Sequence, residues 1–408
     1  TSRGLGDVYK RQMDLNLDGP PLATARTTGS TPFRLVLHVG DVGHAMVVGP
    51  TGSGKSALLS FLALQWFRYP EARVVFFDKG RSARAATLAA GGCWRALEPG
   101  ARFSLQPLAG IDQEIERAWA SEWIAETVRL AGLEPVPRIR EEIWAALAAL
   151  ADAPVAQRTL TVFCALVQDK AVAAALEPLT LKGPHGALLD GEGEALVPSR
   201  FDTFELESMM ATPSAVAPVL SALFHHLERS FDGRPTLLVL DEAWLFLGET
   251  AFAAKIREWL KTLRKKRVAV VFATQSLDDV AASPIATSLI ESCPTQVFLP
   301  NPRALEPSSA RLYQGFGLNR RQLELIAFAT PKRAYYWRQP RGRRLFDLRL
   351  TGVALALCGA SAPEDQTLID DILAASGEAG FAREFLTAKG VHNVDAVFDA
   401  FARPLAAE

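Results

Sequence analysis

Short apolar runs alternate along the chain with segments whose apolar residues recur at helical spacing. Seven runs of strand length cover residues 33–39, 45–48, 72–77, 201–206, 236–240, 268–274 and 296–299. After the second run, one helical face is marked by Leu58, Leu59, Leu62, Leu64 and Phe67. Continuous apolar runs of this length are typical of strands that are buried on both faces of a parallel sheet. The pattern therefore predicts an α/β fold with a mostly parallel sheet.

The strand pattern is interrupted in the middle of the chain. Residues 111–177 are rich in Ala and Leu, contain few turn signals and repeat their apolar positions at helical intervals. One helical face comprises Trp119, Trp123, Ile124 and Val128, and another comprises Ile143, Trp144 and Leu147. We expect an all-helical subdomain at 111–190, inserted into the sheet, with these tryptophans in its core.

The last third of the chain predicts an antiparallel extension of the sheet. Strand-like runs at 334–337, 344–350 and 353–357 are joined by a basic turn at 338–344, and short amphipathic helices follow. The expected organisation is a first core segment at 13–110, the insertion at 111–190, a second core segment at 191–358 and C-terminal helices at 359–408. Residues 1–12 fit nothing downstream and precede Met13, so we treat them as a non-native leader.

A glycine-rich segment, GPTGSGKS at residues 49–56, follows directly after the apolar run at 45–48. It matches the G-x-x-x-x-G-K-[ST] pattern, in which glycines let backbone N–H groups turn toward phosphate oxygens. Lys55 is then placed to reach the β- and γ-phosphates, and Ser56 to bind Mg²⁺. The residues expected to contact a nucleotide are Gly49, Pro50, Thr51, Gly52, Ser53, Gly54, Lys55, Ser56 and Ala57. The complete match and the preceding strand favour a nucleoside triphosphate site over a plain turn.

Two acids follow the apolar run at 236–240. The carboxyl ends of parallel strands face the ligand crevice of an open α/β sheet. Asp241 is therefore a candidate Mg²⁺ ligand, and Glu242 is a candidate base for the water that attacks the γ-phosphate. Gln275 ends the run at 268–274 and is a candidate γ-phosphate sensor, although an ordinary strand-end glutamine fits the pattern too. Asp78, after the run at 72–77, is either near the crevice or in a solvated turn.

Composition leaves this interpretation unchanged. The 408 residues are 49% apolar and 22% charged, with a net charge of −1, which argues against a broad nucleic-acid-binding face. No apolar stretch is long enough to span a bilayer, and no signal peptide is visible. Four cysteines without metal or redox spacing (Cys93, Cys164, Cys293 and Cys358) are expected to be buried thiols. We expect a cytosolic protein.

Several longer motifs resemble one family. These motifs are residues 31–44 before the glycine-rich loop, FDK at 77–79, LDEAW at 240–244, EWLKTLRK at 258–265, ATQS at 273–276 and the segment 295–302. From about Thr31 to the C-terminus the chain resembles the large ATPases of conjugative type IV secretion, of the TrbE type and related to the VirB-four family. The sequence departs from the family at Gly80, Arg81 and Arg267.

The resemblance implies a RecA-like P-loop NTPase with an inserted helical subdomain. It implies ATP and Mg²⁺ as ligands, a hexamer or dimer, and channel components of a secretion system as partners. The protein would lie on the cytoplasmic face of the bacterial inner membrane, without an integral membrane segment, and would drive transfer of DNA or protein and assembly of the channel or pilus. The family's N-terminal docking domain is missing from this sequence, so we expect a fragment or an internal start.

A basic run at 264–267 ends a segment of helical pattern. Cations at a helix C-terminus are favourable in any protein, so a solvated helix end explains the run. The alternative, which the family resemblance favours, is an arginine finger: Arg264 would contact the γ-phosphate of a neighbouring subunit. Two other functions stay open, a DNA-translocating motor or coupling protein and a nucleotide-dependent assembly scaffold.

Overall fold

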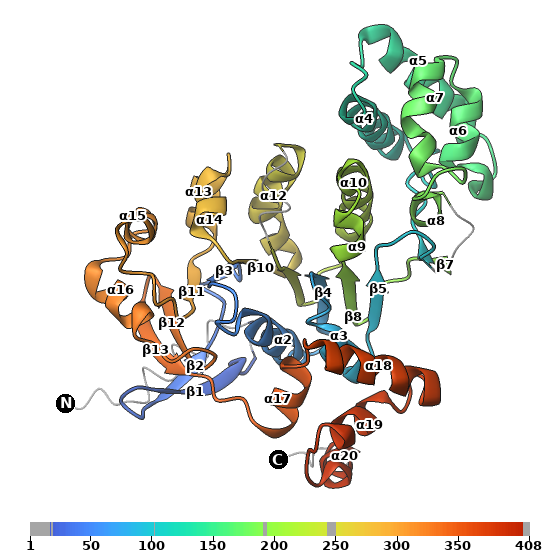
Figure 1. Ribbon diagram of the computed structural model, residues 1–408. Helices are drawn as coiled ribbons and strands as arrows, with labels where there is room; N and C mark the ends of the chain where they lie inside the picture. The colour runs from blue at the N-terminus through green and yellow to red at the C-terminus, as the bar shows by residue number, and fades with distance from the viewer. Residues whose placement is uncertain (1–16, 18, 102, 191–193, 243–249, 403–408) are drawn as a thin grey trace. The chain divides into compact units, whose positions relative to one another are not determined.

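The computed structural model describes residues 17, 19–101, 103–190, 194–242 and 250–402, so the leader expected at residues 1–12 lies outside the described residues. The chain divides into two compact units (Figure 1). The first comprises Thr1–Trp94, Ser199–Phe204 and Gly233–Glu408, and the second comprises Arg95–Pro198 and Glu205–Asp232. The domain boundaries expected from the sequence stay a prediction.

Among the described residues, eleven strands form one sheet in the order β2-β1-β13-β12-β11-β3-β10-β9-β4-β8-β5. The strands are β1 Ala23–Thr27, β2 Pro32–Leu35, β3 Ala45–Val48, β4 Arg73–Asp78, β5 Cys93–Ala96, β8 Phe201–Glu205, β9 Thr236–Leu240, β10 Val268–Thr274, β11 Thr295–Phe298, β12 Ala334–Gln339 and β13 Gly342–Asp347. The central pairs β11–β3, β3–β10, β10–β9 and β9–β4 are parallel, whereas β11–β12, β12–β13, β13–β1 and β1–β2 are antiparallel. The sheet is mostly parallel at its centre, as the apolar runs predict.

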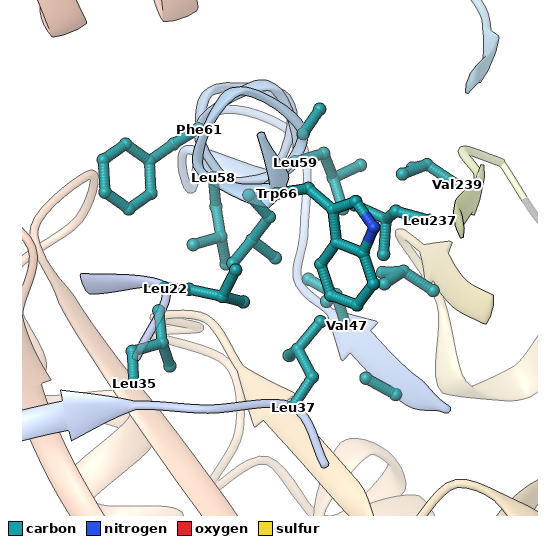
Figure 2. Close-up of a cluster of buried hydrophobic side chains, with 14 of the residues drawn as sticks. Leu22, Leu35, Leu37, Val47, Leu58, Leu59, Phe61, Trp66, Leu237 and Val239 are labelled. Carbon is teal, nitrogen blue, oxygen red and sulfur yellow. The ribbon is translucent and has the colours of Figure 1, made fainter. Parts of the chain in front are cut away.

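The central strands are apolar along their whole length because both of their faces are covered. Every residue of β3, β4, β9 and β10 is buried. On one face lies helix α2, Lys55–Trp66, whose Leu58, Leu59 and Trp66 pack toward Val47 and Leu237 (Figure 2). The glycine-rich loop is thus fixed between a fully buried strand and a helix that belongs to the same core.

The other helices of the first unit cover the sheet or follow it. They are α3 Arg84–Ala89, α12 Thr250–Thr262, η3 Leu263–Lys266, α13 Leu277–Ala282, α14 Ala286–Ser292, α15 Pro307–Gly315, α16 Arg320–Ala327, α17 Gly352–Cys358, α18 Pro363–Ser376, α19 Phe381–Ala388 and α20 Val394–Ala402. The expectation of a strand at 353–357 was wrong, because these residues form α17 and pack against α2 and α3. A short apolar run does not distinguish a strand from a buried helical turn, and tertiary packing decides.

The second unit is mainly helical. Its helices are α4 Glu114–Leu130, α5 Pro137–Ala151, η1 Val155–Gln157, α6 Leu160–Leu166, α7 Lys170–Leu176, η2 Glu177–Leu179, α8 Gly186–Leu189, α9 Glu207–Met210 and α10 Pro213–Ser230. Strands β6 Phe103–Ser104 and β7 Glu194–Ala195 pair with each other in parallel. Trp123 is buried and its Nε1 donates to Pro218 O at 3.1 Å, but Trp144 is 39% exposed beneath the Arg117 guanidinium. The expectation that Trp144 belongs to the core was therefore wrong.

The expectation that all four cysteines are buried holds only in part. All four are free thiols, of which Cys293 and Cys358 are buried, whereas Cys93 and Cys164 are half-buried. Burial raises the pKa of the Cys358 thiol to about 12 and that of Cys164 to about 11. These thiols are protonated at neutral pH and behave as small apolar side chains.

Two buried histidines lie in the core beneath the central strands. His44 is fully buried, and its Nδ1 accepts the Val270 backbone N–H at 3.1 Å. His38 is 4% exposed and stacks on Trp66 with ring centroids 5.9 Å apart. Burial lowers the pKa of each ring to about 4, so both are neutral at pH 7.

We therefore expect the first unit to lose stability as the pH falls from 6.5 to about 4. In this window the unfolded chain binds protons that the folded rings refuse, which costs on the order of 3 kcal/mol for each ring. Urea unfolding curves at pH 7.5, 5.5 and 4.5 measure the loss. The double change His38→Gln/His44→Gln should flatten this pH dependence, whereas His392→Gln, at an exposed histidine, should leave it unchanged. Equal slopes in wild type and the double variant would contradict the prediction.

Candidate active site

The glycine-rich loop connects the end of β3 to the start of α2. The Gly49 N–H donates to Thr274 O at 3.1 Å, which ties the loop to the carboxyl end of β10. Gly52 and Gly54 have φ angles of +79° and +99°, in the left-handed region that favours glycine. Helix α2 begins at Lys55, and Ser56 lies half-buried in its first turn with Ala57. The backbone thus has the strand–loop–helix form that the sequence predicts for a phosphate site.

A turn before β12 holds the loop from the other side. The Lys332 N–H donates to Ser53 O at 3.0 Å. A Cβ at Gly54 would lie 2.9 Å from the Tyr335 hydroxyl and 3.0 Å from Lys332 Cα, so only glycine fits there. Sequence motifs did not indicate these two residues, because the contact joins segments that are far apart in the chain. Figure 1 shows β12 beside β11, next to the strand that leads into the loop.

At the centre of the site, the Lys55 ammonium bonds to both acids that end β9. Its Nζ donates to Asp241 Oδ1 and, at 3.0 Å, to Glu242 Oε1. All three side chains are buried. Burial by itself would lower the pKa of Lys55, but the two carboxylates raise it above its ordinary value. Lys55 is therefore charged at neutral pH and joins the loop to the acid-tipped strand.

Gln275 extends this network from β10. Its Nε2 donates to Glu242 Oε1, and its Oε1 accepts the Thr51 hydroxyl. Thr51 is exposed at the loop, whereas Glu242 is 5% exposed. The chain of contacts therefore runs from the loop through Gln275 to Glu242, and it brings together residues that the sequence analysis selected from three separate strands.

The two acids occupy different environments. Asp241 is 2% exposed, and burial raises the pKa of its carboxyl while the Lys55 ammonium opposes that rise. The Glu242 N–H donates to Asp241 Oδ1 at 2.9 Å. Glu242 itself has a φ angle of +55°, which is uncommon for a residue with a side chain and is found at functional sites more often than elsewhere.

The donor set near the loop suits Mg²⁺. A carboxylate at Asp241 and a hydroxyl at Ser56 are hard oxygen ligands, which this ion prefers, and Mg²⁺ usually keeps waters and phosphate oxygens in its remaining positions. Among the described residues, no group of three or more His, Cys, Asp or Glu side chains gathers as a complete metal cage. The site therefore fits an ion that is held jointly with a nucleotide.

Asp78 does not join the site residues. It is fully buried at the end of β4, where its carboxylate accepts the Ser82 hydroxyl and the Ala83 N–H, both at 2.7 Å. These bonds organise the turn that leads into α3. The sequence left open a place near the crevice or a solvated turn, and the structure shows a buried turn acceptor.

Arg264 lies away from the glycine-rich loop of its own chain. It belongs to η3, just before β10 begins, whereas Gln275 follows the other end of that strand. Its side chain is 44% exposed and lies 3.7 Å from Asp41. An extended strand of seven residues spans about 23 Å, so Arg264 does not contact the phosphate loop of its own chain.

Comparisons with known proteins agree with this geometry. Residues 169–327 match the TraG P-loop domain. The chain is 44% identical over 378 residues to a probable conjugal transfer protein TrbE of Sinorhizobium fredii, covering 91% of this chain and 57% of that protein. It is 30% identical over 349 residues to the "Type IV secretion system protein virB4" of Bartonella henselae, covering 84% of this chain and 44% of that protein. The chain thus spans about half the length of these curated relatives.

The fold is also similar to a solved structure. "Structure of VirB4 of Thermoanaerobacter pseudethanolicus" superposes with a TM-score of 0.65 and 18% identity, covering 83% of this chain and 99% of that one. Across the described residues, no helix has both the length and the apolar character needed to cross a membrane. The chain is therefore a homologue of the TrbE and VirB4 conjugal transfer proteins and has their P-loop NTPase fold.

Proposed function

We propose that the chain binds Mg²⁺-ATP at the glycine-rich loop and hydrolyses it to energise type IV secretion. The observation that carries this proposal is the buried contact of Lys55 with both Asp241 and Glu242, which Gln275 extends. A cation, a metal-binding carboxylate and a second acid within one network are the groups that phosphoryl transfer to water requires.

Binding would redirect Lys55 from the acids to the nucleotide. The loop N–H groups and the α2 N-terminus would surround the phosphates, while the ammonium would contact the β- and γ-phosphate oxygens. Ser56 and Asp241 would hold Mg²⁺, which supplies charge neutralisation when it is bound. The strong local charge of Lys55 in a buried site makes this contact effective, because a low dielectric strengthens it.

Hydrolysis would depend on Glu242 and Gln275. Once Lys55 turns to the phosphates, the Glu242 carboxylate would accept a proton from the attacking water. Gln275 bonds to both Thr51 and Glu242, so a phosphate at the loop would alter its contacts and thereby position the base. Gln275 would in this way report the γ-phosphate to Glu242.

The cellular role comes from the relatives. Their names place them in conjugal transfer and type IV secretion. We infer that this chain acts as a homo-oligomer on the cytoplasmic face of the inner membrane, with channel components as partners and DNA or protein as the transported substrate.

Lys55→Ala should lower ATP turnover about 10²- to 10³-fold, because it removes the cation that offsets phosphate charge in a buried site. Glu242→Gln should cause a loss of similar size but retain ATP binding, because the amide keeps the shape of the side chain and cannot accept the proton. Phosphate release and fluorescent-nucleotide binding measure the two effects. Glu258→Gln, at an exposed acid in α12, is the matched control. Turnover of either site variant within a few-fold of wild type would contradict the assignment.

Arg264→Ala should keep ATP binding but abolish any increase of specific activity with protein concentration. The reason is that Arg264 lies far from its own loop, so it would complete a neighbouring subunit's site. Turnover per chain across a hundredfold dilution measures this effect, with Arg129→Ala as a control at an exposed arginine. Specific activity that is flat in wild type, together with a monomer at every concentration, would show that one chain is complete.

A further inference from the structure

The near-neutral total charge conceals two strongly charged regions of the first unit. Residues 301–350, here named the basic arm, carry eleven Lys and Arg against three Asp and Glu. Residues 352–402, here named the acidic helices, carry eight Asp and Glu against two Lys and Arg. The whole chain has a net charge of −1, so these opposite charges cancel in the composition.

The basic arm exposes most of its cations. It contains α15, α16, β12 and β13, and its exposed cations are Arg303, Arg311, Arg320, Arg321, Lys332, Arg333, Arg341, Arg343, Arg344 and Arg349. Its three acids are already paired, Glu306 with Arg303, Glu324 with Arg320 and Arg321, and Asp347 with Arg333. Among the described residues, Arg311, Arg341, Arg343 and Arg349 form no ion pair. The arm therefore has an uncompensated positive surface.

One pair in the arm is unfavourable for folding alone. Arg338 and Arg343 lie directly opposite each other on β12 and β13. Like charges in this position destabilise a strand pair. Arg338 is fixed by donating from Nη1 to Phe316 O at 2.7 Å, while Arg343 is exposed. A surface anion that approaches this face would relieve the repulsion.

The acidic helices present the complementary surface. Asp365, Asp370 and Asp395 pair with Lys389, Arg84 and Arg383. Four further acids are exposed and form no ion pair within the described stretches of the chain: Glu364, Asp371, Glu378 and Asp399. Two of them, Asp371 and Glu378, lie on α18 and the turn that follows it.

The two surfaces lie toward opposite ends of the same sheet. In the arm, β12 and β13 belong to the antiparallel side of the strand order, and the Gln322 amide of α16 donates to the Tyr336 hydroxyl of β12 at 2.8 Å. In the acidic helices, α17 and α19 pack on α3, which follows β4, and Arg84 of α3 pairs with Asp370 (Figure 1). A molecule with opposite charges at its two ends suits head-to-tail association with a copy of itself.

The exposed apolar side chains of the first unit follow the same division. Among its described residues, the large exposed hydrophobics are Leu305 and Phe328 of the basic arm and Leu355 of α17, beside the acidic helices. Phe328 is 80% exposed and Leu355 is 54% exposed. Apolar side chains within a charged rim are the ordinary composition of a protein interface.

We propose that the basic arm of one chain docks on the acidic helices of a second copy. The contact is heterologous, because two different surfaces meet, and it generates a ring or a filament by repetition. Charge complementarity sets the partner and its orientation, and Phe328 and Leu355 supply apolar contact at the junction. This inference specifies the surfaces of the self-association proposed above, and it does not depend on ATP hydrolysis.

The arm borders the nucleotide site, which gives the docking a consequence. Lys332 bonds to Ser53 of the phosphate loop through its backbone N–H, and Phe328 lies four positions before it. A copy that docks on the arm would therefore contact the segment that holds the loop. Assembly and nucleotide binding should strengthen each other.

Charge-swap variants test the proposal. Arg341→Glu/Arg343→Glu reverses the arm, and Asp371→Lys/Glu378→Lys reverses the acidic helices, all at exposed positions. Each double variant should shift self-association to at least about tenfold higher concentration in sedimentation velocity, because like charges then face each other. The quadruple variant should recover assembly, and wild-type assembly should weaken as salt rises. Arg68→Glu and Glu134→Lys are controls at exposed positions outside both surfaces.

Circular dichroism and fluorescent-nucleotide binding show whether each variant is folded. ATP turnover is measured separately, so an inactive protein that still assembles would count against the proposed function and not against the docking. Unchanged assembly in both double variants would overturn the docking proposal. It would also be overturned if reversal of the arm abolished only binding to a single-stranded oligonucleotide, or to vesicles with anionic lipid, and left self-association intact.

Discussion

The buried ammonium of Lys55 is the contact on which the site depends. It joins the glycine-rich loop after β3 to the two acids after β9, although these segments are 186 positions apart in the chain. Buried charges are stable only with partners, so neither the lysine nor the acids could remain there alone. The parallel strands make the meeting possible, since their carboxyl ends lie at the same edge of the sheet. A phosphate group that enters the loop competes for this ammonium, and this competition links nucleotide binding to the freedom of Glu242.

The sequence predicted the site well because its signals are local. The loop pattern at 49–56 and the acids after 236–240 each follow a strand, and strand ends in a parallel sheet converge without further information. It could not show the Lys332 contact with Ser53 or the lack of room at Gly54, because both arise from tertiary packing. The segment 353–357 was misassigned for a related reason: Val353 and Leu357 fit a strand or a helix equally well, and contacts with α2 and α3 decide.

Whole-chain composition was misleading in one respect. A net charge of −1 argued against any broad charged surface, yet positive and negative charges are separated between adjacent stretches of sequence that fold to different places on the first unit. Separation of this kind survives in a protein when it has a partner of opposite charge, because exposed like charges repel and favour solvation. Arg264 and the basic arm then have distinct roles in one assembly: the first would affect rate, and the second would affect association.

The most direct test of the account is the Mg²⁺ dependence of ATP affinity in wild type and in Asp241→Asn, measured by isothermal titration calorimetry. If Asp241 holds Mg²⁺ beside the phosphates, the ion should tighten ATP binding in wild type by at least about tenfold, and this gain should vanish in the variant. Binding without Mg²⁺ should persist in the variant, because Lys55 and the loop N–H groups remain. An equal gain from Mg²⁺ in both proteins would contradict the assignment of Asp241 and, with it, the proposed arrangement of the site.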